Sequence, residues 1–164
     1  MERQRSVGVR MFGEGDVVTQ LMRVLVLGVA AFNLLLGLTF LIVPQRIAPA
    51  FHVIPDGVAG FATIRADFGA FFLCGAAFAA VGAWQAERAP LRVSLVLLGI
   101  ALGGRLIGVA LDGMVSTTLA PMLAEFAMIS VLGLAYRQFG TEKRRPQHQG
   151  RIHEPGQGGA GVAF

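Results

Sequence analysis

The chain has 164 residues, of which 54% are hydrophobic and only 15% are charged, and its formal net charge is +4. A soluble domain needs about a quarter of its residues charged to cover its surface, so this apolar excess is expected to face lipid. The positive charge could indicate nucleic-acid binding, but the basic residues lack the interleaved aromatic residues of such surfaces. Nucleic acid is therefore excluded as a partner, and an integral membrane protein is expected.

Four apolar runs follow a polar, basic extension at residues 1–20. Each run can span the ~30 Å hydrocarbon core of a bilayer as an α-helix. The first run could also be a cleavable signal peptide, but it exceeds the ~7–15 apolar residues of such a segment, and three more runs follow. The sequence therefore predicts an all-α fold, a four-helix transmembrane bundle over residues 21–139. The expected helices cover about 24–43, 58–84, 91–111 and 119–136.

The distribution of Lys and Arg predicts the orientation of the bundle. The extension, the link at 85–92 and the tail carry most of the basic residues, whereas the loops at 44–57 and 112–118 carry only Arg46. Because loops rich in Lys and Arg stay in the cytoplasm, both termini are expected there. The tail at 140–164 is basic and glycine-rich, and it is expected to be disordered because it cannot bury enough apolar area to fold.

Several polar side chains lie inside the apolar runs or at their ends. A charge near the bilayer centre costs about 2.5–3.5 kcal/mol on insertion scales, so these groups are expected to pair or to line a cavity sheltered from lipid. Counting from the outer ends of the runs places three of them about 9–10 Å deep at ~1.5 Å per residue. We therefore expect one polar cluster in the outer half of the membrane. Its members are Arg65, Asp67, Arg105, Asp112 at the rim, Glu125, and Asn33, which could instead form an interhelical hydrogen bond.

Two stripes of small residues are expected to mark close helix packing, because small side chains let membrane helices approach one another. The stripe in the second run has spacing i+4, and the stripe in the third run contains two overlapping Gly-xxx-Gly pairs. Those pairs fit either internal packing or a dimer interface. The stripes are Ala62, Ala66, Ala70 and Cys74, and Gly99, Gly103, Gly104 and Gly108.

Three interpretations of the polar cluster remain open. It could be a structural ion-pair network, a pocket for a small molecule or lipid headgroup, or a proton or ion path, with Glu125 as the acid that would couple proton movement. Catalysis is not favoured, because a hydrolase or transferase needs a nucleophile with a base or a set of metal ligands. The three histidines are His52 in a loop and His148 and His153 in the tail, and the single Cys74 cannot form an internal disulfide. No catalytic residue, metal or cofactor is assigned.

The segments IRADFGAFFLCG, GGRLIG followed by LDG, and AEF resemble those of a widespread bacterial family of small four-helix inner-membrane proteins of unknown function. The general layout is similar to that of DoxX-like membrane proteins. The resemblance covers roughly residues 20–138. It implies a multi-pass protein of the bacterial inner membrane, and the DoxX-like relationship implies an accessory role in a membrane redox system.

These observations favour a small membrane protein without catalytic machinery. We expect either a subunit of a membrane assembly, with a partner membrane protein or a second copy of the chain, or a binder of a lipid or quinone headgroup. The alternatives are a small proton-coupled transporter that uses Glu125 and an accessory component of a redox system.

Overall fold

The computed structural model describes the backbone of residues 14–142 and the side chains of residues 15–139. Within this part the chain is all helical and contains no strand, as the sequence predicts. Most of the predicted N-terminal extension and most of the predicted tail, with His148 and His153, lie outside the described residues.

Four long helices form the bundle, and each is long and apolar enough to cross a membrane. The prediction of four spans is therefore confirmed. A short helix and a 3₁₀ turn connect the first long helix to the second. In chain order the elements are α1 (Glu14–Ile42), α2 (Pro44–Ile47), η1 (Ala48–Phe51), α3 (Gly57–Gln85), α4 (Arg88–Asp112) and α5 (Ser116–Glu142).

The helices extend beyond the apolar runs that predicted them. α1 begins at Glu14, inside the segment that was expected to be a polar extension. The reason is that an apolar run marks the part of a helix that lies in lipid, whereas backbone hydrogen bonds continue past it into the interface. α5 begins at Ser116, before the predicted start at about residue 119, and Pro121 lies inside this helix.

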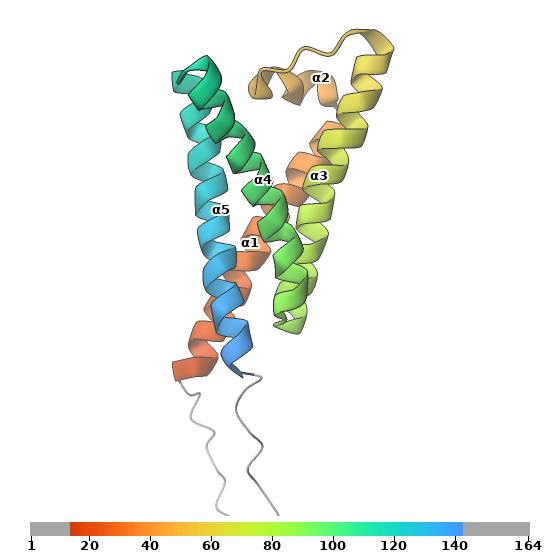
Figure 1. Cartoon of the computed structure of the whole chain (residues 1–164). Coiled ribbons are helices and arrows are strands. Elements are labelled where there is room, and N and C mark those ends of the chain that lie inside the picture. Colours follow the sequence, from red (N-terminus) through yellow and green to blue (C-terminus); the bar gives the residue numbers. More distant parts are fainter. Residues whose placement is uncertain (1–13, 143–164) are drawn as a thin grey trace, which may run out of the picture.

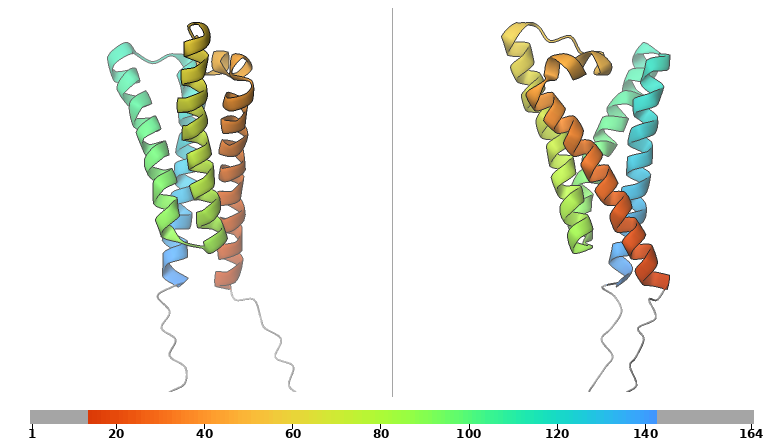
Figure 2. Two further views of the ribbon diagram at one scale, coloured as in Figure 1. Left: turned by 90° about the vertical axis from the view of Figure 1, so that its right-hand side faces the viewer. Right: turned by 180° about the vertical axis from the view of Figure 1, so that it is seen from behind.

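The four helices form a V rather than a parallel bundle (Figure 1). At one end, which we call the closed end, α1 begins, α5 ends and residues 86–87 join α3 to α4. At the opposite end, which we call the open end, α4 and α5 lie apart from α3. The short elements α2 and η1 lie near the mouth of this gap. α1 crosses the molecule diagonally, starting beside α5 and ending beside α3 (Figure 2). Glu14 and Glu142 therefore lie at the same end of the bundle.

The buried core follows this shape. One cluster at the closed end draws residues from all four long helices, including Val26, Ala79, Leu91 and Leu132. The second cluster, with Phe40, Ala48, Ile64 and Phe72, contains α1, η1 and α3 but no residue of α4 or α5. The open end thus lacks a core shared by the two arms of the V.

The predicted small-residue stripes do not mark the close helix contacts of the described chain, and of their members on α3 only Cys74 is half-buried. Ala62, Ala66 and Ala70 are exposed, and a Cβ added at Gly99, Gly103, Gly104 or Gly108 would meet no atom within 4 Å. Close packing uses other glycines instead. A Cβ at Gly37 would lie 2.8 Å from Leu73 Cγ, one at Gly69 would lie 2.9 Å from Leu41 Cδ2, and one at Gly82 would lie 2.5 Å from Leu91 Cδ2.

Gly37→Ala is expected to destabilise the protein, because the added methyl group would also lie 3.0 Å from the backbone nitrogen of Leu73, which cannot move without shifting α3. Overpacking of this kind costs about 1–3 kcal/mol. Gly28→Ala is the matched control in the same helix, since its Cβ would meet nothing within 4 Å. The melting temperature in detergent should fall for Gly37→Ala and should hold or rise for Gly28→Ala. Equal melting temperatures would contradict the close approach of α1 to α3.

Candidate functional site

An ion pair joins α4 to α5 in the open half of the bundle. Arg105 Nε donates a hydrogen bond to Glu125 Oε1 at 2.8 Å. The two helices are antiparallel and are connected by the short link 113–115, in which Gly113 has a φ of 89°. This tight reversal places side chains about two turns from the end of α4 beside side chains about two turns into α5. The two charges therefore meet because of the hairpin between α4 and α5.

Both partners of the ion pair have hydrogen-bonding atoms that the pair itself does not use. Glu125 is 9% exposed, and its Oε2 is buried without a hydrogen-bond partner. The Arg105 side chain is 31% exposed, and a guanidinium group has further N–H donors beyond the one on Nε. An unsatisfied buried oxygen costs about 1–3 kcal/mol. Arg105 thus has N–H donors that a molecule beside it can reach, and Glu125 keeps a buried acceptor without a partner.

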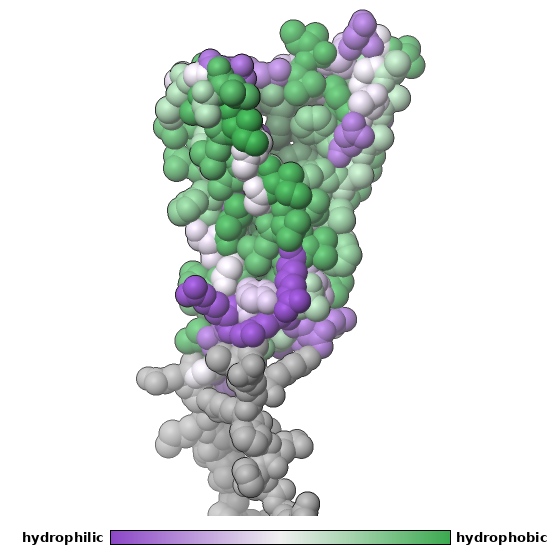
Figure 3. Space-filling view, in the orientation of Figure 1, coloured by the Kyte–Doolittle hydropathy of each residue, from purple (hydrophilic) through white to green (hydrophobic). Residues whose placement is uncertain are grey.

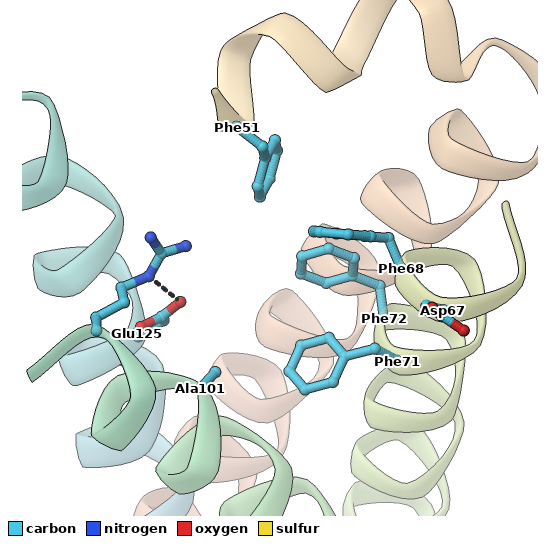
Figure 4. Close-up of a pocket in the computed structure, with 8 residues that line it drawn as sticks. Phe51, Asp67, Phe68, Phe71, Phe72, Ala101 and Glu125 are labelled. Atoms are coloured by element: carbon cyan, nitrogen blue, oxygen red, sulfur yellow. Dashed lines mark hydrogen bonds and ion pairs between the residues drawn. The ribbon is translucent and has the colours of Figure 1, made fainter. Parts of the chain in front are cut away.

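A wall of phenylalanine rings faces this pair across the V (Figure 4). Phe68, Phe71 and Phe72 project from α3 toward Glu125, and Phe51 lies above them on η1. The rings support one another: Phe71 and Phe72 meet edge to face with centroids 5.1 Å apart, and Phe51 and Phe72 do so at 5.9 Å. Such contacts hold the rings in fixed orientations.

The ion pair and the aromatic wall line opposite sides of an open pocket of about 280 Å³. Figure 3 shows a hollow between the two arms near the open end, in a surface that is mostly hydrophobic. A second pocket of about 230 Å³ adjoins it, with Phe51 and Arg105 in both walls. The first pocket is lined by Phe51, Asp67, Phe68, Phe71, Phe72, Ala101, Arg105 and Glu125, and the second by Ala50, Phe51, His52, Arg105, Thr117, Thr118 and Pro121.

The structure brings together only part of the predicted polar cluster. Asp67 lines the pocket, but it is exposed and its carboxylate points away from Glu125. Arg65 is exposed, and its Nε donates to the backbone oxygen of Leu41 at 3.2 Å. Asp112 is exposed at the end of α4. The charges of α3 are therefore separate from the pair on α4 and α5, because the two arms diverge at this depth.

Asn33 also lies apart from the ion pair. It is 3% exposed, and its Nδ2 donates to the backbone oxygen of Val29 at 2.9 Å and to Met128 Sδ at 3.3 Å. It lines a small closed space that it shares with Ser94 and Leu132. This is the interhelical hydrogen bond that the sequence offered as the other interpretation of Asn33.

Sequence reasoning missed the aromatic wall. In the sequence, Phe68, Phe71 and Phe72 belong to the second apolar run, and phenylalanine is common in such runs. Their spacing carries a weak signal, because residues three and four apart lie on one side of a helix. The contribution of Phe51 and His52 had no such signal, because it depends on how α2 and η1 fold over the open end.

No protein-family model matches the chain, and neither the curated proteins nor the solved structures contain a match. The likeness to the four-helix family and to DoxX-like proteins therefore stays a prediction from the motifs of the sequence.

Proposed function

We propose that this small multi-pass membrane protein binds the headgroup of a lipid or quinone in the pocket between α3 and α4. The observation that carries the proposal is the pairing of two unlike walls. Arg105 and Glu125 offer hydrogen-bond donors and acceptors on one side, and the phenylalanines offer flat apolar faces on the other. The volume of about 280 Å³ is close to the lower end of the usual ~300–1,000 Å³ for small-molecule sites.

A quinone ring fits the charges of this pocket better than a phosphate. The Arg105 guanidinium is already neutralised by Glu125 at 2.8 Å, and Asp67 adds a negative charge at the edge. A phosphate would find no surplus positive charge there. A quinone is neutral, its carbonyl oxygens accept hydrogen bonds from guanidinium N–H groups, and its ring can stack on phenylalanine. Binding of this kind would suit an accessory component of a membrane redox system.

A proton-coupled transporter that uses Glu125 is the alternative that the sequence raised. The Oε2 atom of Glu125 is buried and has no hydrogen-bond partner, and this observation supports the transporter. Transport, however, also needs a polar path to the closed end. Below the pocket, Asn33 and Ser94 donate to backbone oxygens, and the space around them has no room for water. This packed layer favours binding over transport.

Two glycine substitutions in α4 test the proposed binding site. At about 100° per residue, Gly108 lies about 20° from Ala101, on the pocket side of the helix. Gly103 lies about 160° from both Ala101 and Arg105. Both glycines have open space where a side chain would project. Gly108→Leu should therefore obstruct the pocket, whereas Gly103→Leu makes the same chemical change on the opposite side.

The readout is binding of a short-chain ubiquinone and of a phospholipid to purified protein, measured by native mass spectrometry from mild detergent. We expect Gly108→Leu to weaken quinone binding by about tenfold, equivalent to ~1.4 kcal/mol, and Gly103→Leu to bind like the unsubstituted protein. Quinone binding that is unaffected by Gly108→Leu, or absent from the unsubstituted protein, would exclude the pocket as a quinone site. Phospholipid binding lost in Gly108→Leu alone would identify a lipid headgroup as the ligand.

A subunit of a membrane assembly is a second candidate, and the unpacked glycines of α4 favour it. Glycine costs about 1 kcal/mol relative to alanine inside a helix. A Cβ added at Gly99 or Gly103 would contact no atom within 4 Å in the described chain. A neighbouring helix could approach closely there. Under this proposal Gly99→Leu should shift the protein to a smaller species in size-exclusion chromatography with light scattering, while Gly28→Leu should leave it unchanged. Identical masses for the unsubstituted protein, Gly99→Leu and Gly28→Leu would contradict association through this face.

A further inference from the structure

A second polar site lies at the closed end, far along the bundle from the pocket. Two arginines of α4 flank the ring of Tyr136 on α5. The Cζ atoms of Arg88 and Arg92 lie 5.2 Å and 5.7 Å from the ring centroid. Arg92 Nε also donates to the Tyr136 hydroxyl oxygen at 2.9 Å, and Arg88 Nη2 donates to the backbone oxygen of Arg137 at 3.0 Å. The structure therefore fixes both guanidinium groups beside one aromatic ring.

This arrangement concentrates positive charge. Each cation–π contact is favourable, but two guanidinium groups beside the same ring repel one another. The charged side chains described on the surrounding elements are Asp16 and Arg23 on α1, Glu87 in the link, Arg88 and Arg92 on α4 and Arg137 on α5. Among the side chains that the structure describes at this end, four arginines therefore stand against two carboxylates.

Two of these arginines also have unsatisfied donors. Nε of Arg23 and Nε of Arg88 are buried and have no hydrogen-bond partner. Arg92 is exposed, so an approaching anion can reach its guanidinium group. Figure 3 shows hydrophilic side chains gathered around this end of the described residues, beneath the hydrophobic body. The excess charge therefore lies where a membrane helix passes from lipid tails to headgroups.

We propose that Arg88, Arg92 and Tyr136 bind the phosphate of an anionic phospholipid at the closed end. Guanidinium groups match the oxygens of a phosphate with paired hydrogen bonds. The Tyr136 oxygen accepts from Arg92, which leaves its own O–H free to donate to a phosphate oxygen. Basic sites between membrane helices on the cytoplasmic side are suited to acidic headgroups, and the distribution of Lys and Arg predicts that this end faces the cytoplasm.

The site is partly organised before a ligand arrives. Arg88 is held by the carbonyl of Arg137, and Arg92 is held by the hydroxyl of Tyr136. Ordering a flexible side chain on binding costs conformational entropy, and these contacts reduce that cost. The site is independent of the proposed quinone pocket, because none of its three residues lines that pocket.

Arg92→Gln and Tyr136→Phe test the site, because the first removes one guanidinium group and the second removes only the hydroxyl that Arg92 contacts. Arg46→Gln is the matched control: Arg46 is an exposed arginine on α2, at the other end of the bundle, and its loss changes the net charge equally. Full-length protein in mild detergent is titrated with phosphatidylglycerol, phosphatidylcholine or inorganic phosphate, and bound species are counted by native mass spectrometry.

We expect phosphatidylglycerol to bind at least tenfold more tightly than phosphatidylcholine. Arg92→Gln should reduce that preference by about tenfold, the effect of losing ~1.4 kcal/mol, and Tyr136→Phe by about threefold. Arg46→Gln and Gly108→Leu should both retain the preference. Equal binding of the two lipids, or an equal loss in Arg46→Gln and Arg92→Gln, would overturn the proposal. Arg92-dependent binding of inorganic phosphate that displaces the lipid would overturn the assignment to a phospholipid and identify free phosphate as the ligand.

Discussion

Arg105→Ala is expected to destabilise the protein more than Glu125→Ala, although both substitutions break the same ion pair. Without Arg105, the carboxylate of Glu125 would stay buried with neither oxygen paired, and an unpaired buried charge costs about 3–5 kcal/mol. Without Glu125, the longer Arg105 side chain is already 31% exposed and can turn its charge toward headgroups or water. We expect the second cost to be about 1–2 kcal/mol.

Thermal unfolding in detergent measures this asymmetry. Replacing both partners with apolar residues, as in Arg105→Met with Glu125→Leu, should recover most of the stability lost in Arg105→Ala, because no charge is then left unpaired. Arg46→Ala, which removes an exposed arginine of α2, serves as the control and should leave the melting temperature nearly unchanged. Equal losses for Arg105→Ala and Glu125→Ala would show that Glu125 is solvated rather than buried.

Phe40→Ala is expected to cost about 3–5 kcal/mol, the usual range for removing a buried aromatic ring. Phe40 is 0% exposed, and its ring contacts Phe51, Phe68 and Phe72 at centroid distances of 5.0, 4.9 and 5.6 Å. It therefore supports the aromatic wall from behind and ties η1 to α1 and α3. Its loss should lower both the melting temperature and the affinity for a ligand in the pocket.

Phe32→Ala provides the comparison for Phe40→Ala. Phe32 lies in the same helix but is 46% exposed, so its ring is expected to face lipid and its removal should cost less than about 1 kcal/mol. A difference of several degrees in melting temperature between the two variants is predicted. Similar melting temperatures would mean that the core formed by Phe40, Phe51, Phe68 and Phe72 does not hold the open end together.

The number of spans and the helical fold could be predicted from the sequence because both depend on local properties. Apolar runs of membrane length report spans directly, and the polar residues within them report that something must shelter charge. The contact between Arg105 and Glu125 lies within reach of the same reasoning. The two residues belong to consecutive helices joined by a short link, and equal depth in an antiparallel hairpin places them side by side.

The remaining parts of the site depend on how the helices cross, which the pattern of residues does not fix. Arg65 and Asp67 are predicted to lie at a membrane depth similar to that of Arg105. In the structure, however, the two arms of the V lie apart at that level. The residues of the predicted stripe on α3 and the glycines that pack closely there are all small, so composition alone could not show that Gly69 and Gly82 pack closely while Ala66 faces outward.

The central claim is that a headgroup binds between Glu125 and the aromatic wall. Photolabelling with a short-chain azidoquinone, followed by peptide mapping, tests it most directly. We expect crosslinks on the α3 wall, at Phe68, Phe71 or Phe72. Unlabelled quinone should compete them away, Gly108→Leu should diminish them and Gly103→Leu should retain them. Crosslinks confined to outward-facing residues such as Leu35 or Phe126, unchanged by competitor or by either substitution, would contradict it.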